Sequence, residues 1–315
     1  MRASIQAVLD QYQVRKTDKQ KRAFIAFMKN HAQEHGYQLE EQPYKRRHGK
    51  NLMVGNPETA QLIVTAHYDT PSSALIPIVT VVGNLPIYVM SHFLIFLPAL
   101  VIFRILQLLV TTIFGDIGVL AAPILFLGFE IPLFVFIMLI LWYFQMMMGF
   151  ANKNNANDNT SGVSVLLSLL EDLPRDQRNK VCFVFFDEEE KGLEGSKFFK
   201  RLYYKEVRFK PLINFDCVGH GKHLIFIRKK EFRTSPFNQL LVETIKGKAL
   251  IKEASHCVYP SDQLIFKQGV AVAAVHRAPI LGYYLSRLHS PFDHRFSTDN
   301  IEVLNQIMIN FIEKI

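Results

Sequence analysis

Hydrophobic positions give both ends of the chain the pattern of an α/β protein. Between residues 4 and 35, apolar positions recur at helical spacing and predict two short helices with a charged join. The apolar runs at 62–66 and 181–186 have the length and the β-branched and aromatic content of buried central strands. Because such strands alternate with helices along the chain, the pattern predicts an α/β sheet flanked by helices.

The same periodicities predict the remaining elements. Further strands are expected at 37–42, 51–54, 211–219 and 270–275, with a hairpin-like region around 223–228. Further helices are expected at 163–173, 193–203, 236–246, 262–267 and 299–312, the first of them entered at Thr160 or Ser161.

The middle of the chain has a different pattern. Residues 71–150 carry only three formal charges. Two apolar stretches, at about 93–114 and 124–149, flank a turn-like Gly-Asp-Ile-Gly sequence. A membrane helix needs roughly 20 apolar residues, so each stretch is long enough to cross a bilayer. The pattern therefore predicts a transmembrane helical hairpin inserted into the α/β domain.

The number of membrane spans is constrained by the two halves of the domain. A weaker apolar stretch at 74–90 would lie in the interface or form an extra span. An odd number of spans would put the two halves on opposite sides of the membrane. Two spans are predicted, with four as the alternative. The insertion is expected at 73–150, dividing one domain into parts at 1–72 and 151–315.

The distribution of basic residues indicates which kinds of partner the protein is expected to bind. The net charge of +8 is spread over three basic clusters, at 15–22, 45–50 and 228–233. A nucleic-acid-binding protein more often concentrates its charge on one motif, and no such motif is found, so nucleic acid is not an expected partner. Beside a membrane insertion, the basic clusters would be attracted to anionic lipid. A solvated basic surface is the alternative.

Cysteine content and the N-terminus suggest a compartment. The three cysteines, Cys182, Cys217 and Cys257, are odd in number and lack a framework spacing, which argues against a disulfide-stabilised secreted protein. The first twenty residues lack the apolar core of a signal peptide. The domain is therefore expected in the cytoplasm, attached to the cell membrane by a multi-pass insertion.

Consecutive acids follow the apolar run that ends at Phe186. Residues 187–190 read Asp-Glu-Glu-Glu. In open α/β sheets, ligands bind in the crevice at the carboxyl ends of the strands. Clustered carboxylates repel one another there unless a cation, a proton or a basic partner neutralises them. The alternative is a helix N-terminus, whose dipole also favours acids.

Other strand ends and loops supply more imidazole and carboxylate groups. The candidates are His67, Asp69, Asp158, Glu189, Glu190, Asp216 and His289. Zinc binds imidazole nitrogen and carboxylate oxygen, and two metal ions about 4 Å apart can act on the attacking and leaving oxygens of one reaction. Singly, each residue also has a structural explanation, such as a helix cap for Asp158 or an Asx-turn for Asp216. Together they predict a metal site at one edge of the sheet.

Five short motifs occur in the order AHYDT, NANDNTSG, EEKGLEGS, INFDCVG and HSPFD. In this order they resemble the M28 family of zinc aminopeptidases, over essentially all of the chain outside residues 72–150. The resemblance implies a phosphorylase/hydrolase-like α/β domain with a mixed sheet and a pair of Zn²⁺ ions.

The resemblance also implies a role for each candidate. It implies five zinc ligands: His67, Asp158, Glu190, Asp216 and His289. Asp158 matches the carboxylate that bridges the two ions, often followed by a cis peptide bond in this family. Glu189 matches the general base, which would take a proton from zinc-activated water and pass it to the leaving amine. Asp69 matches the carboxylate that orients the first histidine. Glu188 makes the register ambiguous, and the Gly-Leu pair that follows selects Glu189 and Glu190.

The chain departs from the family pattern in two respects. Asn155 stands where glycine is usual, although asparagine tolerates a left-handed turn. His67 and Asp158 are 91 residues apart (158−67), far more than usual, because the insertion lies between them. The insertion would put the membrane beside the site, which favours membrane-associated substrates. Tyr259 is a candidate to hydrogen-bond an oxyanion, with a purely structural tyrosine as the alternative.

The sequence thus predicts a membrane-anchored dizinc exopeptidase, most simply an aminopeptidase acting on peptides. Alternatives on the same scaffold are a carboxypeptidase, a deacylase and a glutaminyl cyclase, although five retained ligands favour two-metal hydrolases over single-zinc cyclases. A membrane scaffold with an inactive peptidase domain is a rival of another class. A transporter is disfavoured by the small number of spans. Side-chain preference, oligomeric state and the metal loaded in the cell are left open.

Overall fold

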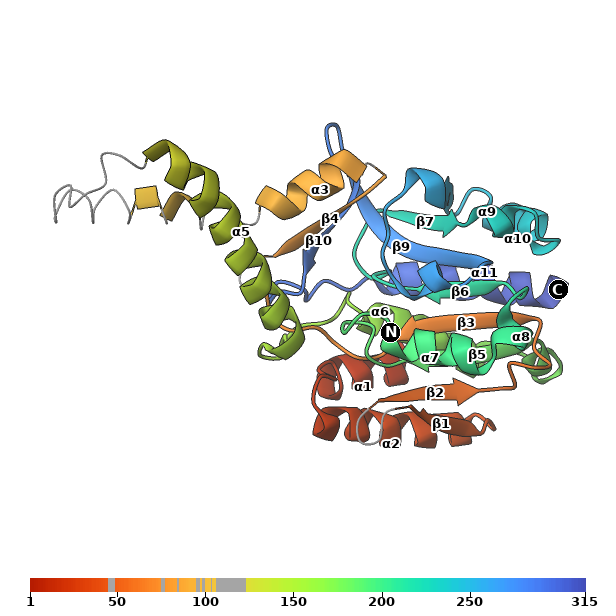
Figure 1. The fold of residues 1–315 in the computed structure, drawn as a ribbon. Coiled ribbons are helices and arrows are strands. Elements are labelled where there is room, and N and C mark those ends of the chain that lie inside the picture. The colour runs from red at the N-terminus through yellow and green to blue at the C-terminus, as the bar shows by residue number, and fades with distance from the viewer. Residues whose placement is uncertain are drawn as a thin grey trace.

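A mixed β-sheet flanked by helices forms the centre of the protein (Figure 1), which confirms the predicted fold class. The computed structural model describes residues 1–44, 49–74, 77–83, 85–94, 97, 100–102, 104–105 and 123–315. The strands are β1 Leu39–Pro43, β2 Lys50–Val54, β3 Leu62–His67, β4 Ile78–Val82, β5 Val181–Phe186, β6 Leu212–Phe215, β7 His223–Arg228, β8 Leu250–Glu253, β9 Gly269–Ala278 and β10 Gly282–Leu288. The helices are α1 Ala3–Gln11, α2 Asp18–Glu34, α3 Leu85–Leu94, α5 Pro123–Met148, α6 Thr160–Asp172, α7 Glu194–Leu202, α8 Tyr204–Val207, α9 Lys230–Arg233, α10 Phe237–Ile245 and α11 Thr298–Lys314.

The central strands of the sheet are parallel and the outer strands antiparallel. Within the described residues the strand order is β1-β2-β5-β3-β6-β9-β10-β4, and β7 lies off this path, paired with β8 and β9. β5, β3, β6 and β9 run parallel to one another. β2, β10 and β4 pair antiparallel at the flanks. The carboxyl ends of β3, β5 and β6 therefore lie at the same edge of the sheet.

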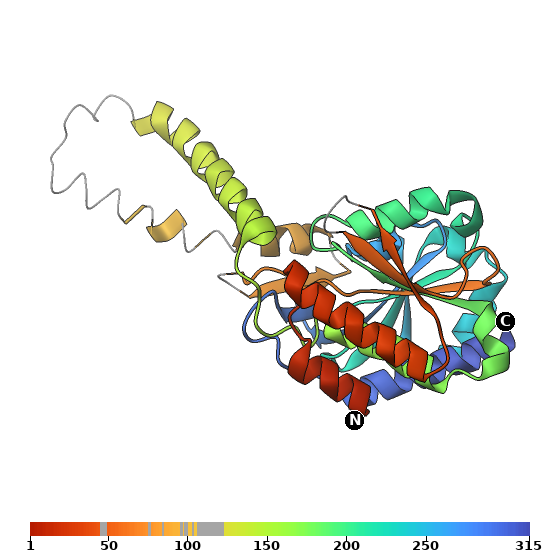
Figure 2. The same cartoon turned by 90° about the horizontal axis from the view of Figure 1, so that it is seen from below.

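Strand β5 shows why the central strands are apolar throughout. Residues 181, 183 and 185 pack in the larger core with α1, α2, α6, α10 and α11. Residues 182, 184 and 186 point the other way and pack in a second core with α7 and α8. Successive side chains alternate between the faces of a strand, and helices cover both faces here. Figure 2 shows α1 and α2 lying across one face of the sheet.

Helix α6 lies unusually close to β6 because Gly162 has no side chain. A Cβ at Gly162 would collide with the carbonyl oxygen of Phe215. Asn159 caps the helix: its Oδ1 accepts a hydrogen bond from the Gly162 N–H at 2.9 Å. Its Nδ2 donates to the Phe215 carbonyl at 2.9 Å. These contacts hold the preceding residue, Asp158, at the carboxyl end of β6.

The predicted membrane spans are tested only in part. The span at 93–114 falls largely outside the described residues. The span at 124–149 coincides with α5, which extends away from the α/β body in both views (Figures 1 and 2) and whose side chains are described from Phe136 onward. Over the described residues, no helix is both long enough and apolar enough to cross a bilayer. The structure thus does not support the transmembrane hairpin, which stays a prediction.

Strands β4, β8 and β10 are absent from the elements that the hydrophobic pattern predicts. β4 lies inside the stretch assigned to the insertion, yet it pairs antiparallel with β10 and belongs to the sheet. Its residues, IVTVV, are as apolar as those around them, so periodicity does not distinguish a strand from a lipid-facing segment there. The sheet therefore continues beyond residue 72.

Two further predictions are wrong in detail. The region 223–228 is not a hairpin, because β7 pairs in parallel with the next strand, β8, and its antiparallel partner is the more distant β9. The helix predicted at 262–267 is a short 3-10 turn, Asp262–Ile265. Both errors have one cause: a segment of four to six residues takes its geometry from distant partners more than from its own periodicity.

Candidate metal centre

The predicted site residues gather at the carboxyl edge of the central strands. His67 is the last residue of β3, Asp216 follows β6, and Glu189 and Glu190 follow β5. Asp158 precedes α6 and His289 follows β10. Parallel pairing of β3 with β5 and β6 brings these strand ends together, although they are far apart in the sequence.

Two of the groups of potential ligand atoms at this edge share Asp158. In the first group, His67 Nε2 lies 3.5 Å from Asp158 Oδ1 and 3.5 Å from Asp216 Oδ1. In the second, His289 Nε2 lies 3.1 Å from Asp158 Oδ2 and 3.4 Å from Glu190 Oε2. Asp158 thus offers one carboxylate oxygen to each group, as a bridging ligand would. The Asp158–Asn159 peptide bond is cis.

These residues fit zinc. With bonds of about 2.0–2.1 Å in a tetrahedral arrangement, two ligand atoms of one ion lie about 3.4 Å apart, close to the separations above. Asp216 Oδ1 is buried and has no hydrogen-bond partner in the described structure, as expected for an oxygen reserved for a cation. Imidazole nitrogens mixed with carboxylate oxygens also favour zinc over magnesium or calcium.

Asp69 holds the backbone of the two glutamates. Its Oδ1 accepts the N–H of Glu189 at 3.0 Å and its Oδ2 accepts the N–H of Glu190 at 3.3 Å. The Nδ1 of His67 lies 3.1 Å from the backbone oxygen of Asp69 and 3.5 Å from its carboxylate. The carboxylate that the resemblance links to the histidine therefore also positions the segment that carries Glu189 and Glu190.

The geometry separates Glu188 from its two neighbours. Its carboxylate accepts hydrogen bonds from Tyr44 at 3.2 Å and from Lys191 at 2.9 Å. Glu189 and Glu190 instead line the same cavity as His67, Asp158, Asp216 and His289. The register chosen from the Gly-Leu pair agrees with this arrangement.

The electrostatics of the site call for positive charge. Burial raises the pKa of Glu189 well above its ordinary value, and the charge of Glu190 adds to the effect. Burial likewise raises the pKa of Glu190, reinforced by Asp158. Burial alone would lower the pKa of His67, but the charge of Glu189 and the nearby carboxylates of Asp158 and Asp216 raise it well above its ordinary value. Without a metal, protons must neutralise these acids; divalent cations would do so instead.

Polar residues that the sequence pattern did not single out hold the Asp158 loop. Asp293 accepts the backbone N–H groups of Asn157 at 3.1 Å and Asp158 at 3.0 Å. Burial raises the pKa of Asp293 to about 8. Asn157 Oδ1 accepts the N–H groups of Gly219 and His220 at 2.8 and 2.9 Å. The one signal for Asp293 is its position, four residues after His289 in the HSPFD motif.

Asn155 and Tyr259 both donate side-chain hydrogen bonds to backbone oxygens. Asn155 is not in a left-handed conformation; its side chain donates to the backbone oxygens of Gln13 and Asn152 at 3.1 and 2.8 Å. The hydroxyl of Tyr259 donates to the backbone oxygen of Asp216 at 2.8 Å, and its ring lines the same cavity as His67. This contact favours the structural explanation of Tyr259.

A buried ion pair holds the first residue of the acidic segment 187–190 in place. Lys21 of α2 contacts the carboxylate of Asp187, and both side chains are almost fully buried. Burial alone would lower the pKa of Lys21, but the charge of Asp187 raises it above its ordinary value. Asp187 also accepts the N–H groups of Lys50 at 3.1 Å and Glu188 at 2.9 Å. Local sequence carries no signal for this pair, which is 166 residues apart.

Replacing Lys21 by methionine should destabilise the protein strongly. The substitution keeps the apolar length of the side chain but leaves the buried Asp187 carboxylate without its cation, which costs about 3–5 kcal/mol. Urea unfolding should detect the loss. Lys29→Met is the matched control: it removes an exposed lysine from Glu41, a change worth about 0–1 kcal/mol. Equal unfolding midpoints for the two variants would contradict the assignment.

The candidate ligands open into a cavity of about 200 Å³. Its lining includes residues of both groups of potential ligands. An apolar part of the lining comes from β4, α5 and β10: Ile78, Trp142, Met146, Leu285 and Leu288. The segment predicted as an insertion therefore contributes directly to the wall of the site.

Comparison with known proteins agrees with this arrangement. The chain matches the model of peptidase family M28 over residues 146–312, more than half of its length. That segment contains four of the candidate ligands: Asp158, Glu190, Asp216 and His289. No curated protein sequence matches the chain.

Several solved structures share the fold at low sequence identity. The aminopeptidase LapA of Legionella pneumophila matches with a TM-score of 0.55 and 11% identity, over 99% of this chain and 67% of that one. A glutaminyl cyclase of Porphyromonas gingivalis matches with a TM-score of 0.58 and 14% identity, over 99% and 96% of the two chains. A Zn-dependent exopeptidase of Parabacteroides distasonis matches with a TM-score of 0.54 and 13% identity, over 98% and 96%. Identities this low show likeness of fold alone, whereas the family match covers more than half of the chain and four of the five candidate ligands; the chain therefore belongs to peptidase family M28.

Proposed function

We propose that this protein is a zinc-dependent exopeptidase, and within that class an aminopeptidase that removes N-terminal residues from peptides. One zinc ion would be held by His67, Asp158 and Asp216, and a second by Asp158, Glu190 and His289. The observation that carries the proposal is the pair of Asp158 oxygens, each directed to a different imidazole. A single-zinc enzyme would have no use for the second group.

Zinc, Glu189 and Asp69 would each have a different role in the reaction. When bound, zinc supplies Lewis acidity, which polarises a peptide carbonyl and makes water more acidic. Glu189 would accept a proton from the attacking water and deliver it to the leaving amine. Asp69 would keep Glu189 in position through its backbone N–H.

The cavity supports an exopeptidase with a preference for apolar residues. Its volume of about 200 Å³ is below the roughly 300–1,000 Å³ of pockets for larger ligands, which suits a single terminal residue. Trp142 and Met146 of α5 line this cavity together with the candidate ligands. A leucine or methionine side chain would bury its surface against them.

A metal-dependence experiment tests the proposed activity. A panel of chromogenic aminoacyl amides, with one glutamine-initiated peptide, is offered to the purified full chain before and after chelation. Hydrolysis should be fastest for apolar residues, should fall below about 1% after chelation, since zinc chemistry carries the reaction, and should return on zinc addition. Ammonia release from the glutamine peptide with no amide hydrolysis would identify a cyclase instead. If the zinc-loaded protein hydrolysed none of the substrates, the result would favour a scaffold protein with an inactive peptidase domain.

We also propose that the protein is anchored in the cell membrane by 73–150, with the catalytic domain in the cytoplasm. Exposed apolar side chains support the anchoring, because a membrane would remove them from water. Phe136, Leu141 and Phe144 of α5 are each more than half exposed, and Phe150 is 90% exposed. Contiguous exposed apolar surface marks a membrane or protein contact.

Fractionation of cells tests the anchoring. The full chain should stay in the pellet through an alkaline carbonate wash and dissolve only in detergent. Protease added to intact cells should leave the catalytic domain uncut, and the same protease should cut it after lysis. Recovery in the soluble fraction without detergent would contradict the anchoring but leave the proposed activity untouched.

A further inference from the structure

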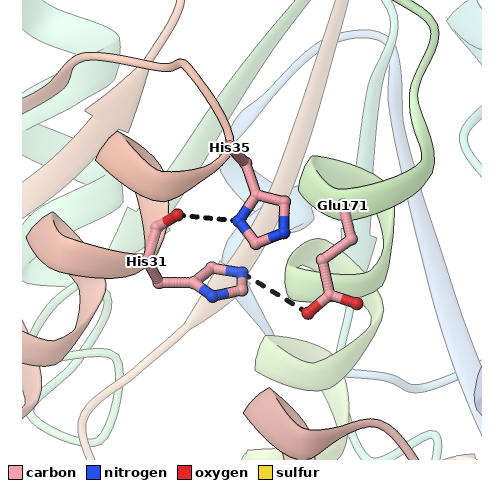
Figure 3. A group of neighbouring side chains, drawn as sticks. All are labelled: His31, His35 and Glu171. Carbon is pink, nitrogen blue, oxygen red and sulfur yellow. Dashed lines mark hydrogen bonds and ion pairs between the residues drawn. The ribbon is translucent and has the colours of Figure 1, made fainter.

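A second group of potential metal ligands lies at the far end of α6. His31 and His35 come from the last turn and the C-cap of α2, and Glu171 comes from the last turn of α6. Figure 3 shows both imidazole rings beside the Glu171 carboxylate. Asp158 and Glu171 lie beside opposite ends of α6, so this group is about 17 Å along the helix axis from the candidate metal centre, at 1.5 Å per residue.

The ligand atoms of this group converge. One atom from each of His31, His35 and Glu171 lies within 4.8 Å of the other two. His31 Nε2 is 3.5 Å from Glu171 Oε1. Two ligand atoms of one tetrahedral zinc are about 3.4 Å apart, so this pair already has the spacing of a shared ion. The i, i+4 spacing of the histidines puts them on one face of α2.

His35 has the tautomer that zinc requires. Its Nδ1 lies 2.9 Å from the backbone oxygen of His31, so the proton is on Nδ1 and the lone pair is on Nε2. A carbonyl hydrogen bond of this kind is the usual support of a zinc-binding imidazole. Arg178 donates to the backbone oxygen of His35 at 2.9 Å and keeps this helix end in position.

His31 supplies the independent evidence for a ligand. It is only 5% exposed, and its Nε2 has no hydrogen-bond partner in the described structure although it points at Glu171. A buried nitrogen without a partner is costly, and a bound cation would remove that cost.

The surrounding charges leave room for a divalent cation. Arg2 contacts three carboxylates: Glu171 at 3.0 Å, Asp172 at 2.7 Å and Glu302 at 3.0 Å. One guanidinium thus neutralises one of three negative charges. Ser4 donates its hydroxyl to Glu171 Oε1 and leaves further lone pairs on that oxygen. The excess of negative charge favours a cation beside His31.

We propose that His31, His35 and Glu171 bind a structural Zn²⁺ ion that fastens α2 to α6. Two imidazoles and one carboxylate are a ligand set that proteins use for zinc, whereas magnesium and calcium prefer oxygen alone. His35 is half-buried, so water can reach the fourth position. The ion cross-links the N-terminal helical pair to the helix that begins beside Asp158.

Zinc counting tests the site on the full-length protein. Wild type, His35→Gln and Glu171→Gln are equilibrated at a buffered free zinc concentration of about 1 µM, the range of a specific site, and their bound metal is measured by mass spectrometry. Wild type should hold one zinc more than either variant. His256→Gln, at an exposed histidine, is the matched control and should hold as many as wild type. Equal zinc content in wild type and His35→Gln overturns the proposal.

A second measurement needs no variant to fold. Crystals of the wild-type protein soaked in zinc should give an anomalous peak at the zinc edge between the three side chains, and an empty map there overturns the proposal. In solution, zinc at a hundredfold excess over the dissociation constant should raise the Tm of wild type by about 5 °C more than that of His35→Gln. Both outcomes are independent of peptidase activity, since neither variant alters the candidate metal centre.

Discussion

A Glu189→Gln variant should lose about 10²–10⁴-fold in kcat while keeping its zinc, the loss expected when a general base is removed. Glutamine matches the volume of glutamate but cannot accept the proton of the attacking water. Its backbone N–H would still bond to Asp69, as that of Glu189 does at 3.0 Å, so the segment should keep its position. Substrate binding should therefore change little, and the loss should appear in kcat rather than in KM.

Metal content decides between the two roles open to Glu189. Its carboxylate also lies near His67 and Glu190, in a third group of potential ligands. If Glu189 were a ligand, the variant would lose zinc together with activity; if it is the base, zinc stays bound. Glu58→Gln, at an exposed glutamate, is the matched control and should retain full activity. Wild-type kcat in Glu189→Gln would remove Glu189 from the mechanism.

Central strands were predictable because helices bury them on both faces. The apolar runs that became β3 and β5 carry no polar face, so their length and composition were sufficient. Acids and imidazoles directly after such runs then pointed to one edge of the sheet. Parallel pairing of β3, β5 and β6 makes that inference work, because it carries all the strand ends to the same side.

Features that could not be predicted from the sequence depend on contacts between residues far apart in the chain. Lys21 reaches Asp187 across 166 residues, and Asp293 reaches Asn157 across 136. No periodicity or motif records such a pairing. β4 was hidden for a different reason, since an edge strand and a membrane-facing segment have the same apolar composition. The wall that α5 and β4 give to the cavity was therefore also beyond prediction from pattern alone.

The second large effect is expected at Asp158. Asp158→Asn keeps the shape of the side chain but replaces one oxygen by an amide group, which cannot bind a cation. Because each oxygen serves a different imidazole, the loss of one should disrupt one of the two ions directly. The variant should hold at least one zinc fewer than wild type, and zinc affinity at this site should fall more than about 100-fold, since even residues that merely orient a ligand cost about 10–100-fold.

Activity in Asp158→Asn should fall at least as far as in Glu189→Gln, for a reason that the metal count distinguishes. The backbone of Asp158 is held by Asp293 at 3.0 Å, so the loop should remain folded and circular dichroism unchanged. Asp10→Asn, at an exposed aspartate of α1, is the matched control and should retain its zinc and its rate. If Asp158→Asn bound as many zinc ions as wild type and hydrolysed aminoacyl amides normally, the shared carboxylate would have no part in the reaction. The two groups of ligands would then be separate clusters of acids and imidazoles, each needing its own explanation.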